Sequence, residues 1–149
     1  MMNTKNNNLL VSGAIVFKDY HGNRRWLLIK NPKDGRWEIP KITVRRGESS
    51  VRASLRMTGE MAGMNTRVLE EAGRTSGATV INGKSIPVKY YYYLLVYKSG
   101  GETIGFEAFE WMDYAKAIKK VDLKREKDML RGAKTVLREW EKERKKKKS

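Results

Sequence analysis

The stretch that decides the fold is residues 37–64, WEIPKITVRRGESSVRASLRMTGEMAGM. Its start is a strand candidate that stops at Pro40, and a loop is expected up to the glycine at position 47. The acidic and hydroxyl side chains at 48–50 suit a helix start, and Gly63 stands where a helix end favours a left-handed residue. The pattern therefore predicts a strand, a loop and a helix over residues 50–62.

The predicted helix has two faces that differ in character. At about 100° per residue, one narrow stripe is expected to face the core. Its members are Val51, Leu55, Thr58 and Ala62. A second face, about 145° away by the same periodicity, is rich in methionine. Its members are Ala53, Met57, Glu60, Met61 and Met64.

Strand candidates lie on both sides of this segment. Residues 9–17 and 25–30 are apolar and β-branched, and the YHGN between them predicts a hairpin turn. The only histidine, His21, falls in that turn and is expected to be a surface residue, because no second imidazole accompanies it. Further strands are expected over 66–69, 78–81, 88–97 and 107–112.

The long strand candidate contains four consecutive tyrosines, residues 90–93. Alternation along a strand would place two on each face of the sheet, as half-buried aromatics, although a base-stacking platform is an alternative. After this strand, Asp113 or Asp122 is expected to cap a helix. The last helix should pack on the sheet through Met129, Ala133, Val136, Leu137 and Trp140.

Length and composition limit the possible classes of protein. A chain of 149 residues with 40% apolar residues predicts one domain, divided as a flexible N-terminus (1–8), the domain (9–143) and a basic tail (144–149). The absence of cysteine excludes disulfides, thiolate catalysis and cysteine-based zinc sites. The polar N-terminus and the short apolar run after it argue against a signal peptide or a membrane span, and a cytoplasmic protein is expected. Oligomeric state stays open.

The net charge of +15 would attract phosphates on nucleotides, nucleic acid or anionic lipid. Part of it lies in an unbroken terminal run: Arg144, Lys145, Lys146, Lys147 and Lys148. One interpretation is a solvated, frayed tail. The alternatives are an electrostatic anchor for RNA or a ribosome, and a membrane surface.

The stretch 37–64 resembles the signature of the Nudix hydrolases, and the spacing matches without a gap. That signature is a glycine, five residues, a glutamate, seven residues, then Arg-Glu, an aliphatic, any residue, Glu-Glu, any residue, glycine and an aliphatic, with Trp-x-x-Pro-Lys before it. The matching residues here are Trp37, Pro40, Lys41, Gly47, Glu48, Arg56, Glu60, Gly63 and Met64. The resemblance implies an α+β fold: an α/β/α sandwich with a mixed sheet, a signature loop-helix and a C-terminal helix.

Four positions depart from the signature. Ile42 replaces the first glycine, Thr58 replaces an aliphatic, and Met57 and Met61 replace two glutamates. Phosphoanhydride cleavage in this family uses Mg²⁺ or Mn²⁺, and such hard cations require several converging oxygen ligands. The positions 57, 60 and 61 share one helical face, which here offers Met, Glu and Met. A neutral thioether does not replace carboxylate on magnesium.

The resemblance assigns roles to the remaining residues. Glu60 is the retained metal ligand, Glu48 a second oxygen donor, and Glu107 resembles a later glutamate that some members bring into the site. Lys41 is a candidate phosphate contact, and Gly47, Arg56 and Gly63 maintain the signature loop and helix. For Glu60 the alternative is an exposed helix glutamate paired with a cation, and for Lys41 an ordinary lysine.

Two functions follow as hypotheses. The first is a Nudix-like protein with impaired or absent catalysis that binds nucleotide pyrophosphate groups, RNA or a ribonucleoprotein. The second is an active Mg²⁺- or Mn²⁺-dependent hydrolase of nucleoside diphosphate-linked substrates, such as dinucleoside polyphosphates or RNA 5′ ends. A third possibility is that the match is accidental and the chain is simply a basic α/β domain.

Overall fold

A computed structural model describes residues 2–3, 8–101 and 108–148. Its strands are β1 (Met2–Asn3), β2 (Asn8–Tyr20), β3 (Asn23–Lys30), β4 (Trp37–Glu38), β5 (Lys41–Thr43), β6 (Met64–Ile81), β7 (Lys84–Gly100) and β8 (Phe109–Met112). Its helices are α1 (Ser50–Ala62), α2 (Tyr114–Lys120) and α3 (Lys124–Lys148). The expected flexible N-terminus lies partly outside the described residues.

The strands form one mixed sheet in the order β4-β3-β2-β7-β6. β2 runs parallel to β7 and antiparallel to β3, while β6 and β7 form a long antiparallel hairpin. Three short strands pair with inner strands of this order: β1 and β5 pair with β2, and β8 pairs with β3. The mixed sheet predicted from the resemblance is therefore confirmed.

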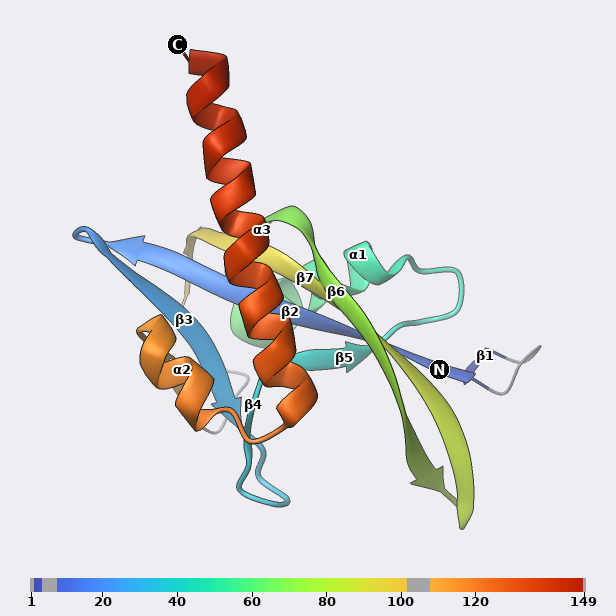
Figure 1. The fold of residues 1–149 in the computed structure, drawn as a ribbon. Coiled ribbons are helices and arrows are strands. Elements are labelled where there is room, and N and C mark those ends of the chain that lie inside the picture. Colours follow the sequence, from blue (N-terminus) through green and yellow to red (C-terminus); the bar gives the residue numbers. More distant parts are fainter. Residues whose placement is uncertain (1, 4–7, 102–107, 149) are drawn as a thin grey trace.

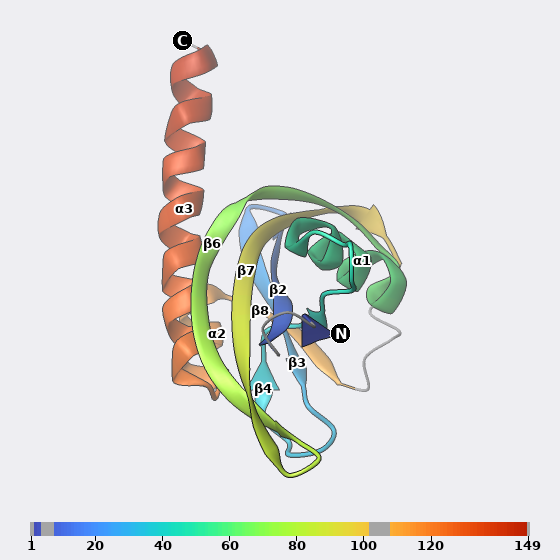
Figure 2. The same ribbon diagram turned by 90° about the vertical axis from the view of Figure 1, so that its right-hand side faces the viewer.

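Helices cover the two faces of the sheet, with α1 on one face and α2 and α3 on the other (Figures 1 and 2). Each face has its own buried core. On the α2–α3 face, Ile15, Tyr92 and Leu94 pack against Leu130 and Leu137. On the α1 face, a smaller core contains Ala14, Val16, Met57, Tyr93 and Leu95. The α/β/α sandwich follows from this alternation, because successive strand residues point to opposite faces.

The tyrosine run obeys the alternation rule. Tyr90 and Tyr92 belong to the α2–α3 core, with ring centroids 6.3 Å apart, and Tyr93 lies in the α1 core with Tyr91 packed against it. All four are at least partly buried, so they do not form an exposed stacking platform. The expected surface position of His21 is confirmed: it is exposed, at the hairpin turn, with a φ of 47°.

Two boundary predictions need correction. The strands expected over 66–69 and 78–81 are parts of one continuous strand, β6, which stays paired with β7 through three register shifts. Such β-bulges bend a strand without ending it, and this is why the polar residues between the two segments look like a loop in the sequence. The last strand, predicted over 107–112, begins at Phe109. Ala108 lies outside the strand, and Glu107 lies outside the described residues.

The basic run at the C-terminus is not an extended tail. Arg144 and the lysines after it continue α3, which runs from Lys124 to Lys148 without interruption. The last turns of α3 extend beyond the sheet in both views (Figures 1 and 2). Among the described residues, no helix has the length and apolar character needed to cross a membrane.

Candidate functional site

The helix within residues 37–64 has the predicted limits, and capping explains them. The loop before it is shorter than predicted, because Lys41–Thr43 pair with β2 as strand β5. The Ser49 hydroxyl accepts a hydrogen bond from the Arg52 amide at the start of α1. Gly63 ends the helix with a φ of 64°, and its amide bonds back to the Gly59 carbonyl at 3.1 Å. A left-handed residue at this position satisfies orphan helix carbonyls, and glycine adopts it without a Cβ penalty.

The buried face of α1 matches only half of the predicted stripe, because Thr58 and Ala62 are buried as predicted but the other two members are not. Val51 and Leu55 are 38% and 39% exposed, whereas Met57 is only 3% exposed. The buried side chains of α1 are Ala53, Ser54, Met57, Thr58 and Ala62. Serine and threonine can lie here because each hydroxyl is hydrogen-bonded. The Thr58 hydroxyl, for example, lies 2.8 Å from that of Thr66.

Glu48 and Arg56 tie the loop to the helix. The Arg56 guanidinium donates to both Glu48 oxygens at 2.8 and 3.0 Å and to the Thr43 carbonyl at 3.0 Å. Glu48 Oε1 also accepts from the Arg45 amide at 3.0 Å. Hydrogen bonding by Arg56 lowers the pKa of Glu48 to about 2. The carboxylate that was expected to offer an oxygen to a metal thus already accepts three hydrogen bonds, two of them on Oε1.

Ile42 occupies the first glycine position without strain. It lies in β5, where it pairs with Ser12 of β2, and its side chain packs against the α1 core. His21 and Asn82 are the only non-glycine residues with a positive φ among those described. The backbone at Ile42 is therefore an ordinary strand and does not require glycine.

The helical face expected to hold metal is poor in oxygen donors. Met57 is buried, Met61 is 38% exposed, and Glu60 is the exposed carboxylate of the three. Glu60 lies close enough to Arg56 to help raise the pKa of that guanidinium, although Glu48 contributes more. Glu107 lies outside the described residues. Across residues 2–3, 8–101 and 108–148, no group of three or more carboxylates or histidines could hold an ion, so the described residues do not fit Mg²⁺ or Mn²⁺.

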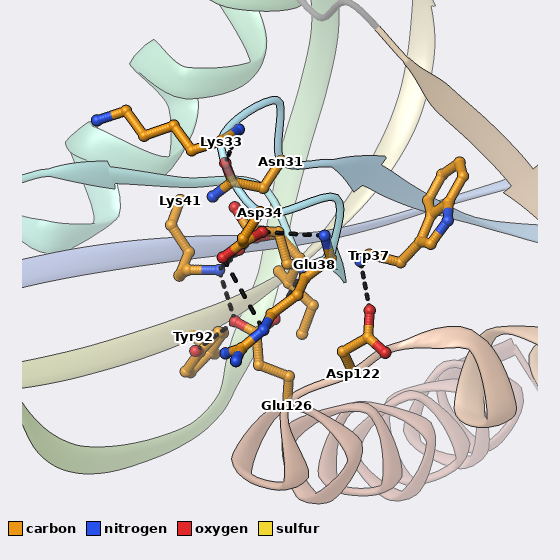
Figure 3. A network of polar contacts seen from close by, with 11 residues as sticks. Asn31, Lys33, Asp34, Trp37, Glu38, Lys41, Tyr92, Asp122 and Glu126 are labelled. Carbon is orange, nitrogen blue, oxygen red and sulfur yellow. Dashed lines mark hydrogen bonds and ion pairs between the residues drawn. The ribbon is translucent and has the colours of Figure 1, made fainter.

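Lys41 also has a different environment from the expected one. Its ammonium donates to Glu126 Oε2 at 2.8 Å and to the Ile39 carbonyl at 2.9 Å, and it lies 3.5 Å from Glu38 (Figure 3). The Lys41 side chain is 14% exposed. Lys41, the expected phosphate contact, is therefore a mostly buried residue whose ammonium is already ion-paired and hydrogen-bonded to protein oxygens.

Glu126 is the residue that sequence reasoning missed. It is fully buried, and its oxygens accept from the Ile39 amide at 2.9 Å, from Lys41 and from the Tyr92 hydroxyl at 2.7 Å (Figure 3). Burial, followed by the charge of Glu126, raises the pKa of Tyr92, which therefore stays a donor. One signal was available: Glu126 lies four residues before Leu130, on the same buried face of α3.

A second link joins the start of β4 to the connection between α2 and α3. The Trp37 amide donates to the Asp122 carboxylate at 2.7 Å, and the Asp122 amide donates to the Trp37 carbonyl at 3.0 Å. Of the two predicted caps, Asp113 is the one that caps α2, accepting from the Lys116 amide at 2.8 Å. Asp122 instead holds the segment that leads to Lys41.

A pocket of about 290 Å³ opens beside this network. Its polar lining includes Glu38, Lys41 and Thr43, and the β6–β7 hairpin contributes Thr79 and Tyr90. Burial raises the pKa of Glu38, while Lys41 opposes the shift. The pocket can thus present a cation, a carboxylate and an aromatic edge to one ligand, the mixed lining expected of a small-molecule site.

Comparison with solved structures decides the fold family. An Ap4A hydrolase of C. elegans superposes on this chain with a TM-score of 0.67 at 22% sequence identity, and the match covers 87% of this chain and 97% of the hydrolase. The chain has the Nudix fold.

Two further Nudix-fold structures agree. The dihydroneopterin triphosphate pyrophosphohydrolase of E. coli gives a TM-score of 0.69 at 11% identity, over 81% of this chain and 91% of that one. The NUDIX domain of Shewanella oneidensis NrtR, complexed with ADP ribose, gives 0.61 at 16% identity, over 87% and 88%. No protein-family model and no curated protein matches the sequence.

Proposed function

We propose that this Nudix-fold protein binds a nucleotide through its pyrophosphate and hydrolyses it weakly or not at all. One observation carries the proposal: Met57, where the signature has a glutamate, is packed into the α1 core and is 3% exposed. A thioether in that position offers nothing to a hard cation. Glu48, a second candidate ligand, already accepts three hydrogen bonds from Arg56 and the Arg45 amide.

The pocket beside Lys41 supports the binding half of the proposal. A diphosphate reaching Lys41 would compete with Glu38 and Glu126 for its ammonium. A base could contact only the edge of Tyr90, because the Arg125 guanidinium lies 4.2 Å from the centre of that ring. The named ligands of structural neighbours, ADP ribose and Ap4A, are nucleoside diphosphate-linked molecules of this kind. We take such molecules as the ligand class. An RNA 5′ end, free or in a ribonucleoprotein, would present the same pyrophosphate group on a larger molecule.

The second candidate is an active hydrolase of dinucleoside polyphosphates or RNA 5′ ends that uses Mg²⁺ or Mn²⁺. The observation that favours it is the exposed Glu60, which lies beside Arg56 on the helical face expected to hold the metal. With Glu48 engaged, such an enzyme would depend on Glu60 together with Glu107.

One experiment separates the two. Binding of ADP ribose and Ap4A is measured by calorimetry, and turnover of both by chromatography with Mg²⁺ or Mn²⁺. We expect binding without metal-dependent turnover, and we expect Glu60→Gln to change neither. Turnover above background that is lost in Glu60→Gln but kept in Glu143→Gln, an exposed glutamate on α3, would overturn the proposal in favour of the hydrolase. Absence of both binding and turnover would leave only the fold.

A further inference from the structure

One face of α3 carries a continuous line of cations, which we call the basic stripe. Its members are Lys127, Arg131, Lys134, Arg138, Lys142 and Lys145. Their spacings of 4, 3, 4, 4 and 3 keep all six within an arc of about 80° over roughly 27 Å of helix. The acidic residues Asp128, Glu139 and Glu143 fall outside this arc. Of the terminal basic run, only Lys145 belongs to the stripe.

The stripe's charges are weakly neutralised. Arg131 and Lys142 pair with Asp128 and Glu139 one turn back, at 3.1 and 4.0 Å, and all four side chains are more than half exposed. Exposed pairs of this kind contribute little and exchange readily. Within the described part of the chain, Arg138 and Lys145 make no ion pair. The stripe therefore keeps most of its positive field.

A pocket of about 300 Å³ interrupts the stripe between α3, α2 and β3. Lys134 and Arg138 lie on its rim, and Trp26, Tyr114 and Leu137 supply its apolar lining. The Lys134 ammonium lies 4.1 Å from the centre of the Tyr114 ring. Arg24, also in the pocket, is held by Asp19 at 2.8 Å and Glu141 at 3.2 Å, so the cations left to attract an anion are Lys134 and Arg138.

We infer that the basic stripe binds the phosphodiester backbone of a single-stranded nucleic acid, and that one base stacks on Tyr114 when the Lys134 ammonium moves from that ring to a phosphate. Cations at regular intervals suit a repeating phosphate, and an aromatic wall between them suits a base. A membrane surface fits less well, because an interfacial helix needs a free apolar face. The apolar face of α3, with Leu130, Ala133 and Leu137, is buried on the sheet. This site is separate from the pocket beside Lys41.

The test uses the full chain and fluorescently labelled single-stranded RNA and DNA of mixed sequence, titrated between about 50 and 200 mM salt. Lys134→Gln/Arg138→Gln removes two stripe cations. Each lost phosphate contact should make the log–log salt slope shallower by about 0.7, so the pair should lose about 1.4. The matched control, Lys33→Gln/Lys84→Gln, removes two exposed lysines away from α3, one in a turn and one at the start of β7, and should keep the wild-type slope.

Tyr114→Leu addresses the pocket, and its far-ultraviolet circular dichroism and melting temperature report whether it folds. We expect this variant to bind single-stranded nucleic acid roughly tenfold more weakly than wild type. The salt slope should stay unchanged, because stacking carries no charge. Whichever of RNA and DNA binds more tightly is the nucleic acid that the stripe prefers.

Three results would overturn the inference. The first is no binding to either strand at about 50 mM salt. The second is an equal decrease of the salt slope in both double variants, which would mean that binding depends on the net charge of the protein and not on the stripe. The third is binding to vesicles containing phosphatidylserine that exceeds binding to both nucleic acids and depends on Lys134 and Arg138. Titration of ADP ribose into Lys134→Gln/Arg138→Gln should match wild type, whichever way the proposed nucleotide function falls.

Discussion

Replacing Glu126 by leucine should destabilise the protein severely. The carboxylate is fully buried and accepts from the Ile39 amide, the Lys41 ammonium and the Tyr92 hydroxyl at 2.7–2.9 Å. Without it, Lys41 remains 14% exposed with only Glu38, at 3.5 Å, as an ionic partner. Removing one member of a buried pair costs about 3–5 kcal/mol, because the other charge loses its compensation.

That cost is large for a chain of this size. Single domains have roughly 5–15 kcal/mol of stability, so the substitution should remove about a fifth or more of it. At about 2–4 °C per kcal/mol, the melting temperature should fall by about 6–20 °C. Urea unfolding followed by circular dichroism measures the free energy, and Glu143→Leu, at an exposed position of α3, is the control, expected within about 0.5 kcal/mol of wild type.

The double variant Lys41→Met/Glu126→Leu tests the cause. If part of the loss comes from an orphaned charge, removing both charges should recover that part, since hydrophobic replacement of a whole buried pair is often neutral. The Ile39 amide and the Tyr92 hydroxyl lose their acceptor in both variants. An unfolding free energy of Glu126→Leu within about 0.5 kcal/mol of wild type would refute the reasoning. So would a double variant less stable than the single one.

Three other substitutions test the signature segment and the sheet. The Glu48–Arg56 pair holds the pKa of Glu48 near 2, below its usual 4.5, so its contribution is present above pH 4.5 and lost as the pH falls toward 2. The difference in urea midpoint between wild type and Glu48→Gln should therefore shrink over that range, and a pH-independent difference would contradict this. Gly63→Ala places a Cβ at a φ of 64° and should cost about 1 kcal/mol in the same assay; an unchanged midpoint would argue against the left-handed cap. Gly13→Ala would put its Cβ into the Tyr92 ring, and overpacking should cost about 1–3 kcal/mol. Recovery in Gly13→Ala/Tyr92→Leu would identify the ring as the obstacle, and no loss in Gly13→Ala would show that the ring can move.

The helix of residues 50–62 shows which features can be predicted from local sequence and which cannot. Its limits could be predicted, because Ser49 and Gly63 act locally on the backbone. Its buried face was predicted only in part by residue spacing, which placed Thr58 and Ala62 in the core correctly and Val51 and Leu55 wrongly. Thr58 is buried while Val51 and Leu55 are exposed, because the Thr58 hydroxyl finds Thr66 on β6. A partner from another element, which the helix sequence does not contain, made the polar residue the better one to bury.

The candidate site depended still more on contacts between distant residues. The matching spacing over residues 37–64 predicted the loop-helix and the fold, and the chemistry of methionine predicted a helical face poor in metal ligands. Local geometry could not reveal that Lys41 meets Glu126, which follows 85 residues later. It also could not reveal that Arg56 would occupy both oxygens of Glu48.

Sequence alone therefore determined the features that depend on neighbouring residues. These are the turn at His21, the limits of α1, the alternation of the tyrosines, and the positions where carboxylates are missing. Tertiary structure decided which charges are engaged and which are available: Lys41 and Glu48 have partners, while the basic stripe of α3 faces solvent. The physical reason is that a charge acts according to its burial and its nearest counter-charge. In this protein the packing of α3 against the sheet sets both for Glu126 and Lys41.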